Sequence, residues 1–304
     1  MPSLISKIIF YTKQIINITL FSFCALYGVV VSIVLKIIGK PRYAQWATAR
    51  CWYYVIGWVL GLRVKLINEH ILKESSPCIF VSNHQSSLDI FMIGRAFPPG
   101  CTVTSKKSLK YVPFLGWFMY LSDTLFLDRK NRTSSVQTLN KGLAKVVNEK
   151  RSLWIFAEGT RSKTTELTML PFKKGAFYLA SEGKIPIVPV VFSNTSTIMN
   201  DKLKIFNRGE IIVKVLDPIP TVNITTKEQI DELSVKVRDL MVKELKENVG
   251  YSIPTSVDTS LPKEYLEWKK AKSAATISAT KSNSPVNSEA TSIEENETTS
   301  LLRK

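Results

Sequence analysis

The sequence is poor in histidine and in paired cysteine. Only two histidines, His70 and His84, occur in 304 residues, so a metal centre built from several histidines is excluded. The 4 cysteines form no C-x-x-C pair, and Cys24 lies inside an apolar run, a pattern that fits neither a disulfide framework nor a zinc site. The sequence also has no G-x-S-x-G motif, the strained turn that presents the nucleophilic serine of α/β-hydrolases. We therefore expect no metal site and no serine nucleophile of that kind.

Acidic residues are outnumbered as well. The 25 Asp and Glu residues stand against 41 Lys and Arg residues, which gives a formal charge of +16. Such an excess favours an anionic partner: a nucleic acid, a membrane surface or a phosphorylated substrate. From Ala271 onward 4 basic and 4 acidic residues cancel, so the whole excess lies on residues 1–270. The segment 271–304 is rich in Ser, Thr, Ala, Asn and Glu with little to bury, and we predict that it is disordered.

Two apolar runs stand near the N-terminus. Residues 15–35 are 21 residues without a charge, which matches the roughly 20 residues that cross a hydrocarbon core of about 30 Å. This run predicts a transmembrane helix, with a signal peptide or a buried soluble helix as alternatives. More basic residues closely follow the run than precede it, which indicates a cytosolic C-terminal side. The second run, 51–62, is too short to span but rich in Trp and Tyr, so it predicts an interfacial or re-entrant helix, or else a buried soluble one.

From about Arg63 the pattern alternates between strand and helix signals. Runs rich in β-branched and aromatic residues predict strands at 63–68, 78–82, 124–128, 152–157, 187–192 and 211–216. Apolar residues fall on one helical face in 133–149 and in 226–247. Strands that alternate with helices predict an α/β sheet domain. We expect three parts: a membrane anchor with an interfacial helix (1–62), the α/β domain (63–250) and a linker with a disordered tail (251–304).

A polar stretch, NHQSSLD at 83–89, lies between a strand signal and an apolar helical run. Reactive groups of α/β folds gather where strands end and loops begin. Asp89, five residues after His84, can turn back through the first helical turn to the imidazole, fix its tautomer and stabilise its charged form. The pair therefore fits a general base. The alternative is structural: Asn83 or Ser86 caps the helix, and His84 makes an ordinary hydrogen bond.

Two further stretches carry groups that could hold a phosphate. In FAEGTRS, 156–162, a glycine permits close approach of the backbone to a ligand, and Arg161 offers a planar fork of donors. A turn with a surface arginine explains the same residues equally well. In SKKSLKYVPFLGW, 105–117, three lysines precede a proline, and Arg129 follows the strand signal at 124–128. Charge runs are usually solvated faces, but this one lies between the two other candidate stretches.

Together these stretches resemble the glycerolipid acyltransferases. The four blocks of that family are matched in order and spacing, over about 63–220, by NHQSSLD (83–89), KKSLKYVPFLGWF (106–118), FAEGTRS (156–162) and IPIVPVV (185–191). Ala157 stands where many members have proline, a difference that touches the rigidity of a turn. The resemblance implies a mixed sheet flanked by helices in an acyltransferase domain at 63–250, with a transmembrane or interfacial helical anchor before it.

The block that begins at Glu158 is similar to the lysophosphatidate type within the family. The resemblance therefore implies transfer of an acyl group from acyl-CoA, as co-substrate, to the sn-2 hydroxyl of lysophosphatidate, with no cofactor. It implies that His84 deprotonates the hydroxyl, that Asp89 orients His84, and that the alkoxide attacks the thioester directly. The implied substrate-binding residues, with Arg161 on the acceptor phosphate, are Lys106, Arg129, Glu158, Gly159, Thr160 and Arg161. IPIVPVV is expected to be a buried strand beside the acyl pocket, or plain core.

Other functions are open on the sequence. A relative could acylate another lysophospholipid or glycerol phosphate, a non-catalytic lipid-binding protein could keep the fold, and charge alone would suit a nucleic-acid binder. The intact His84 and Asp89 disfavour mere binding, and a membrane run without a nucleic-acid motif disfavours the last. Because acyl-CoA is made in the cytosol, we expect the domain on the cytosolic face of the endoplasmic reticulum, or on a lipid droplet. Its expected partners are the bilayer, lysophosphatidate and acyl-CoA, and no nucleic acid.

Overall fold

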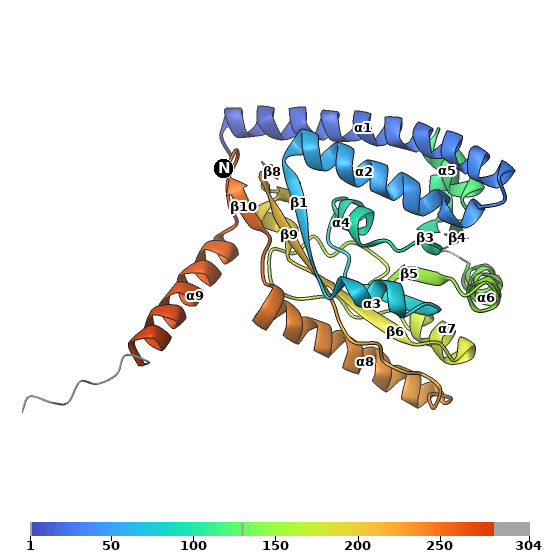
Figure 1. The fold of residues 1–304 in the computed structure, drawn as a ribbon. Coiled ribbons are helices and arrows are strands. Elements are labelled where there is room, and N and C mark those ends of the chain that lie inside the picture. The colour runs from blue at the N-terminus through green and yellow to red at the C-terminus, as the bar shows by residue number, and fades with distance from the viewer. Residues whose placement is uncertain (1, 129–130, 283–304) are drawn as a thin grey trace, which may run out of the picture. The chain divides into compact units, whose positions relative to one another are not determined.

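The computed structural model describes residues 2–128 and 131–282 (Figure 1). Its helices are α1 (Leu4–Ile37), α2 (Ala44–Leu60), α3 (Glu69–Glu74), α4 (Asp89–Ala96), α5 (Leu115–Leu121), α6 (Arg132–Asn148), α7 (Gly175–Gly183), α8 (Lys227–Glu244) and α9 (Lys263–Ser282). Its strands are β1 (Leu62–Ile67), β2 (Cys78–Ser82), β3 (Cys101–Lys106), β4 (Leu125–Leu127), β5 (Ser152–Phe156), β6 (Ile187–Phe192), β7 (Met199–Asn200), β8 (Ile205–Phe206), β9 (Arg208–Val215) and β10 (Ile253–Ser256). A short 3₁₀ helix, η2 (Lys107–Tyr111), lies between β3 and α5.

The main sheet has 8 strands in the order β1-β9-β6-β2-β5-β3-β4, with β10 added to β9. Strand β9 runs antiparallel to β6 and to β10, whereas the other pairs are parallel. The sheet is therefore mixed and flanked by helices, which confirms the predicted fold class. All six predicted strands are present, as β1, β2, β4, β5, β6 and β9. The sequence reading missed β3, which ends in Ser and Lys, and β10, in which Pro and Ser weaken the strand signal.

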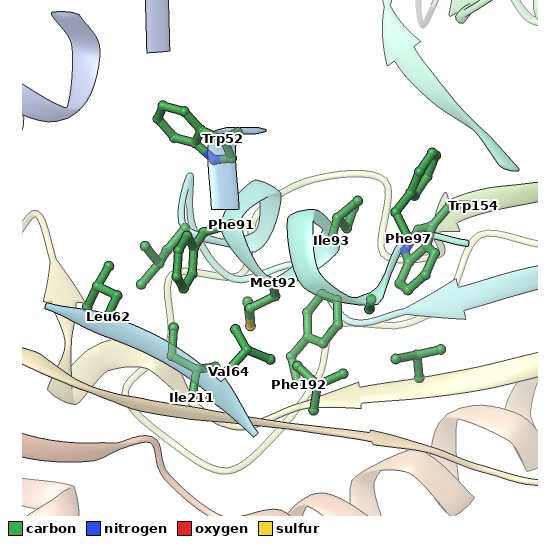
Figure 2. Close-up of a cluster of buried hydrophobic side chains, with 14 of the residues drawn as sticks. Trp52, Leu62, Val64, Phe91, Met92, Ile93, Phe97, Trp154, Phe192 and Ile211 are labelled. Carbon is green, nitrogen blue, oxygen red and sulfur yellow. The ribbon is translucent and has the colours of Figure 1, made fainter. Parts of the chain in front are cut away.

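Two hydrophobic cores lie on opposite faces of the main sheet. Strand β2 is buried at every residue and supplies both, since Phe80 enters one core and Ile79 the other. The first core joins the sheet to α1, α2 and α4, and Figure 2 shows part of it, with Val64 of β1 beside Ile211 of β9. The second core joins the sheet to α6, α7 and α8. Figure 1 accordingly shows α1 and α2 on one side of the sheet and α7 and α8 on the other.

Helix α1 extends the predicted run 15–35 in both directions. It has 34 residues and, by length and composition, could cross a membrane. In the structure it packs along α2 and also contacts α5 and β8. Gly28 allows the closest approach, because a Cβ there would lie 2.7 Å from atoms of Thr48 and of Phe118. Near its N-terminal end, Lys13 donates hydrogen bonds to Asp258 and to the Phe206 carbonyl. Helix α1 is thus packed against the α/β domain along much of its length.

Helix α2 covers most of the second predicted run, 51–62. One side of the helix is buried at three- and four-residue intervals, by Gln45, Thr48, Trp52, Ile56 and Leu60. The other side leaves Tyr54 and Trp58 exposed. Such two-sided packing agrees with an interfacial helix, although it suits a helix of a soluble core as well.

The chain after 250 continues into the same compact unit, which extends to Tyr265. Strand β10 pairs with β9, the Ser252 hydroxyl bonds that of Ser193 at 2.7 Å, and Thr259 donates to Asn207. Helix α9 takes up the first part of the segment 271–304 for which disorder is predicted. The rest of that segment, 283–304, lies outside the described residues. The boundaries at 62 and 250 stay predictions.

Candidate active site

The polar stretch after β2 brings His84 and Asp89 together. Asp89 is the first residue of α4, and its Oδ2 lies 2.5 Å from Nδ1 of His84. The same carboxylate, fully buried, accepts hydrogen bonds from the backbone amides of Gln85, at 2.6 Å, and of Ser86, at 3.2 Å. Because a carboxylate only accepts, Nδ1 carries the proton and the lone pair of the neutral ring is on Nε2. The pair therefore has the tautomer that a general base requires.

The imidazole of His84 is held in its plane by an aromatic neighbour. Phe156 ends β5, next to the last residue of β2, and its ring stacks on His84 with centroids 4.1 Å apart at 22°. The His84 side chain keeps 16% of its surface exposed, and it lines the large cavity described below. A base that is rigid and still accessible can reach a substrate hydroxyl.

The residues on either side of His84 fix the loop to the end of β6. Asn83 donates to the Phe192 carbonyl at 3.0 Å and accepts from the Phe192 amide at 2.8 Å. Gln85 donates to the Ser193 carbonyl at 2.9 Å and accepts from the Thr195 amide at 3.0 Å. Asn83 therefore does not cap α4, which was the structural alternative. Sequence reasoning missed this scaffold, although two amide side chains beside a buried strand had to find partners.

Glu158 connects the catalytic loop to the long loop after β5. One carboxylate oxygen accepts from the His84 amide at 2.6 Å and the other from the Leu170 amide at 2.9 Å. Burial raises the pKa of the Glu158 carboxyl to about 6, and these two hydrogen bonds oppose that rise. Both oxygens are thus used in holding backbone, one at His84 and the other at Leu170. The acceptor-binding role predicted for Glu158 stays a prediction.

The other predicted binding residues lie around the same cavity. Gly159 has a φ of +69°, which favours glycine, and the chain turns there to present Thr160 and Arg161, both exposed. Lys106, exposed at the end of β3, also lines the cavity. Within the described residues, no acidic side chain forms an ion pair with Arg161 or Lys106. Arg129, the remaining predicted residue, lies outside the described residues.

Two lysines that the sequence reading did not single out complete this basic rim. Lys163 and Lys173 belong to the irregular loop between β5 and α7, and both line the cavity with Arg161. The loop returns to the site through backbone hydrogen bonds, from Ser162 to the His84 carbonyl at 2.8 Å and from Lys173 to the Ala157 carbonyl at 2.6 Å. An irregular segment has no periodicity, so its return could not be predicted from pattern alone.

The cavity has a volume of about 1020 Å³, at the upper end of the range for ligand pockets. His84 and the basic rim line one part of it. Apolar side chains from several elements line the rest, among them Phe21, Cys24 and Ala25 of α1, Trp52 of α2, and Phe118 and Met119 of α5. No described residue of β6 is among those that line it, so IPIVPVV is plain core here. The cavity thus combines a base, a cationic rim and an apolar chamber, which suits a phosphorylated lipid.

Across residues 2–128 and 131–282, no three His, Cys, Asp or Glu side chains come together to hold a metal ion. The chemistry that the site offers is proton transfer by His84, with Asp89 to balance the charge that develops on the ring.

Comparisons with known proteins agree with this arrangement. Residues 63–193 match the family model described as Acyltransferase. The chain is 54% identical over 284 residues to a 1-acyl-sn-glycerol-3-phosphate acyltransferase of Saccharomyces cerevisiae, which covers 93% of this chain and 92% of the yeast protein. It is 40% identical over 182 residues to the human 1-acyl-sn-glycerol-3-phosphate acyltransferase beta, with 57% of this chain and 64% of the human protein covered.

A solved structure has the same fold. The crystal structure of the 1-acyl-sn-glycerophosphate (LPA) acyltransferase PlsC from Thermotoga maritima matches with a TM-score of 0.61 at 21% identity. The match covers 81% of this chain and 97% of the bacterial one, so the common fold includes more than the central sheet.

Proposed function

Because this chain belongs to the acyltransferase family, we infer that it transfers an acyl group from acyl-CoA to the sn-2 hydroxyl of 1-acyl-sn-glycerol 3-phosphate. The products are phosphatidate and CoA. The observation that carries this inference is the 54% identity, over 93% of the chain, to the yeast enzyme named for that acceptor. The His84–Asp89 pair on a cavity with basic and apolar parts supplies the chemistry that such a transfer needs.

In the mechanism that we propose, His84 Nε2 accepts the proton of the sn-2 hydroxyl while the hydroxyl oxygen attacks the thioester carbonyl. The tetrahedral intermediate then collapses, the carbon–sulfur bond breaks, and the imidazolium returns its proton to the leaving CoA thiolate. Asp89 stabilises the imidazolium between these two steps. General-base catalysis supplies about 10²–10⁴-fold, so positioning of two substrates in one cavity must supply much of the rest.

Direct transfer fits better than an acyl-serine intermediate. Ser86 and Ser87 are the serines that follow His84 most closely in the sequence. The Ser86 hydroxyl accepts from the Leu88 amide at 3.1 Å and lies 3.5 Å from the Thr195 hydroxyl. The Ser87 hydroxyl contacts the sulfur of Met199 at 4.0 Å. Neither hydroxyl is bonded to the imidazole that would have to activate it.

The cavity suggests where each part of the acceptor binds. Arg161 and Lys106 lie on its rim and form no ion pair with any acidic residue of 2–128 and 131–282, so we place the acceptor phosphate there, with the fork of Arg161 making two bonds. The acyl chains then lie against the apolar walls supplied by α1, α2 and α5. Gly159 and Thr160 shape the turn that presents Arg161, and Glu158 holds this turn to His84.

Helix α1 is one long apolar helix that can serve as a membrane anchor. Its outward side exposes large apolar residues, among them Ile15, Ile18, Phe23, Val30 and Val34. We place the domain on the cytosolic face of the endoplasmic reticulum, where acyl-CoA is available and where anionic headgroups attract basic residues. Proteinase K added to sealed microsomes should then digest the chain after α9, and protection of that segment would contradict the orientation.

The acceptor is tested directly with membranes that contain the overproduced protein. CoA release is measured with lysophosphatidate, lysophosphatidylcholine or glycerol 3-phosphate as acceptor, and membranes with His84→Ala protein give the background. We expect release with lysophosphatidate to exceed release with either other acceptor. Faster release with lysophosphatidylcholine or glycerol 3-phosphate would instead assign the chain to another acceptor within the family.

A further inference from the structure

The hairpin formed by η2 and α5, residues 107–121, has a rigid tip. The Gly116 amide donates to the Val112 carbonyl at 2.7 Å, and a Cβ on Gly116 would lie only 2.0 Å from the Lys110 carbonyl oxygen. Only glycine therefore allows α5 to fold back so closely on η2. Phe114, just before α5, has a φ of +59°, a strained value for a residue with a side chain. A strained, tightly closed turn indicates that the backbone that carries the outer side chains is held in a defined shape.

The hairpin has an inner and an outer side. Its inner side lines the cavity with the apolar residues Leu109, Leu115, Phe118 and Met119. Its outer side leaves three aromatic side chains exposed, Tyr111 at 76%, Trp117 at 56% and Tyr120 at 65%. None of these three lines the cavity, so binding of substrate inside the chamber does not explain them. Trp and Tyr are the residues that settle where hydrocarbon meets headgroups.

The hairpin lies next to α1, which also has exposed apolar residues. Helix α5 packs against α1, where Phe118 lies beside Gly28, and Figure 1 shows α5 next to the C-terminal part of α1. Exposed apolar residues of that part of α1 include Tyr27, Val30 and Val34. An anchor that sets α1 on a bilayer therefore brings the hairpin to the same surface.

Charge on the hairpin favours an anionic surface. Residues 101–122 include Lys106, Lys107 and Lys110 and no acidic residue. The ammonium group of Lys110 lies 5.0 Å from the centre of the Tyr120 ring, on the outer side, and Lys107 pairs with Asp128 at 3.2 Å. Aromatic side chains next to lysines suit a phospholipid surface, because the rings enter the headgroup layer and the ammonium groups meet the phosphates.

We propose that the η2–α5 hairpin is a second membrane contact, in which Tyr111, Trp117 and Tyr120 enter the headgroup layer of an anionic phospholipid bilayer. This inference rests on the proposed function, because it gives the hairpin a role in the uptake of a lipid acceptor. With its outer side in the headgroups and its inner side on the cavity, the hairpin sets the basic rim at the depth of the lysophosphatidate phosphate. The acceptor can then enter without leaving the bilayer.

The contact is tested with the full chain reconstituted in vesicles of phosphatidylcholine and phosphatidylserine that carry bromine on their acyl chains near the headgroups. Bromine quenches the fluorescence of nearby tryptophans only. The fluorescence of Trp117 is the difference in emission between wild type and Trp117→Phe. We expect this difference in emission to be severalfold smaller in brominated vesicles than in vesicles of the same lipids without bromine. The matched control is Trp117→Phe with Tyr178→Trp, which adds an exposed tryptophan on α7, on the other face of the sheet. Bromine should not quench the emission of this added tryptophan. An unquenched Trp117 overturns the proposal.

A kinetic test uses the variant in which Tyr111, Trp117 and Tyr120 are all serine. For long-chain lysophosphatidate in vesicles, KM should rise about tenfold, as expected for the loss of three interfacial aromatic residues. For a short-chain, water-soluble lysophosphatidate, KM should stay within about twofold, since that acceptor enters from water. An equal rise for both acceptors overturns the proposal. If wild type acylates neither, the proposed function fails, and the quenching of Trp117 still decides the membrane contact by itself.

Discussion

The catalytic loop, 83–89, and the basic rim differ in how the protein holds them. In the loop, the polar groups of Asn83, Gln85 and Asp89 are buried and hydrogen-bonded. On the rim, Lys106 and Arg161 are exposed and form no ion pair with any acidic residue that the structure describes. The base is thus held in position before substrate binds. The charges of Lys106 and Arg161, by contrast, form no ion pair within the described part of the chain.

This difference separates chemistry from binding. A preorganised base costs no reorganisation when the proton moves, so changes in the loop should lower kcat. A charge that has no protein partner can be satisfied by the ligand, so changes on the rim should raise KM for the acceptor. Glu158 joins the two regions, because it bonds the His84 amide and begins the turn that presents Arg161.

The largest effect is expected from His84→Ala. Loss of the base should lower kcat by about 10³-fold, within the range of general-base catalysis, while the protein still accumulates in membranes. The measurement is the initial rate of CoA release with saturating lysophosphatidate. His70→Ala is the matched control, because the other histidine is exposed on α3, and it should keep normal activity. A rate near that of wild type in His84→Ala would remove the base from the mechanism.

Asp89→Asn should be less severe. The amide oxygen can still accept from Nδ1 of His84, but the negative charge that stabilises the imidazolium is lost. A hydrogen bond to a charged group contributes about 1.5–3 kcal/mol, so kcat should fall about 10–100-fold. The same rate assay measures it, and a thermal unfolding curve checks that the variant is folded. Unchanged kcat in a folded variant would show that Asp89 only shapes the loop.

Arg161→Lys probes the rim. Lysine keeps the charge but loses the planar fork, so KM for lysophosphatidate should rise about tenfold, the equivalent of about one charge-assisted hydrogen bond. Steady-state kinetics with each substrate varied in turn should show a much smaller rise of KM for acyl-CoA. Arg63→Lys, an exposed change on β1, is the control. Equal rises for the two substrates would move Arg161 away from the acceptor phosphate.

The smallest effect concerns the pH dependence of stability at Glu158. Burial raises the pKa of this carboxyl from 4.5 to about 6, so the folded state binds more protons than the unfolded state between these values. The contribution of Glu158 to the free energy of unfolding is therefore fully present below pH 4.5 and is lost as the pH rises through 6. The total loss is about 2 kcal/mol. Denaturant unfolding of wild type and Glu158→Gln, in matched detergent at several pH values, measures the difference. We expect the free energy of unfolding of wild type to fall relative to that of Glu158→Gln as the pH rises. A rise of the wild-type value relative to the variant would contradict this sign.

The sequence predicted six strands and the His84–Asp89 pair for a clear physical reason. Runs of β-branched and aromatic residues, as in 187–192, reflect local preferences, and a five-residue spacing fixes the reach of Asp89. The rest depends on tertiary contacts. Lys173 reaches the cavity through an irregular loop. Glu158 accepts hydrogen bonds from the backbone amides of His84 and Leu170, and the first of these bonds joins segments far apart in the chain. For the apolar wall formed by α1, the sequence predicted a membrane helix and left a buried helix as an alternative, because lipid and a cavity interior both favour apolar residues.

The separation of loop and rim is tested most directly by binding without turnover. Affinity for lysophosphatidate is measured by titration of the inactive His84→Ala protein and of the double variant with Arg161→Lys. We predict that the Kd of His84→Ala for lysophosphatidate is within about twofold of the wild-type value, and that the added Arg161→Lys change raises this Kd about tenfold. If His84→Ala itself loses the acceptor, or if Arg161→Lys leaves its affinity unchanged, the base and the phosphate site are not the separate regions described here.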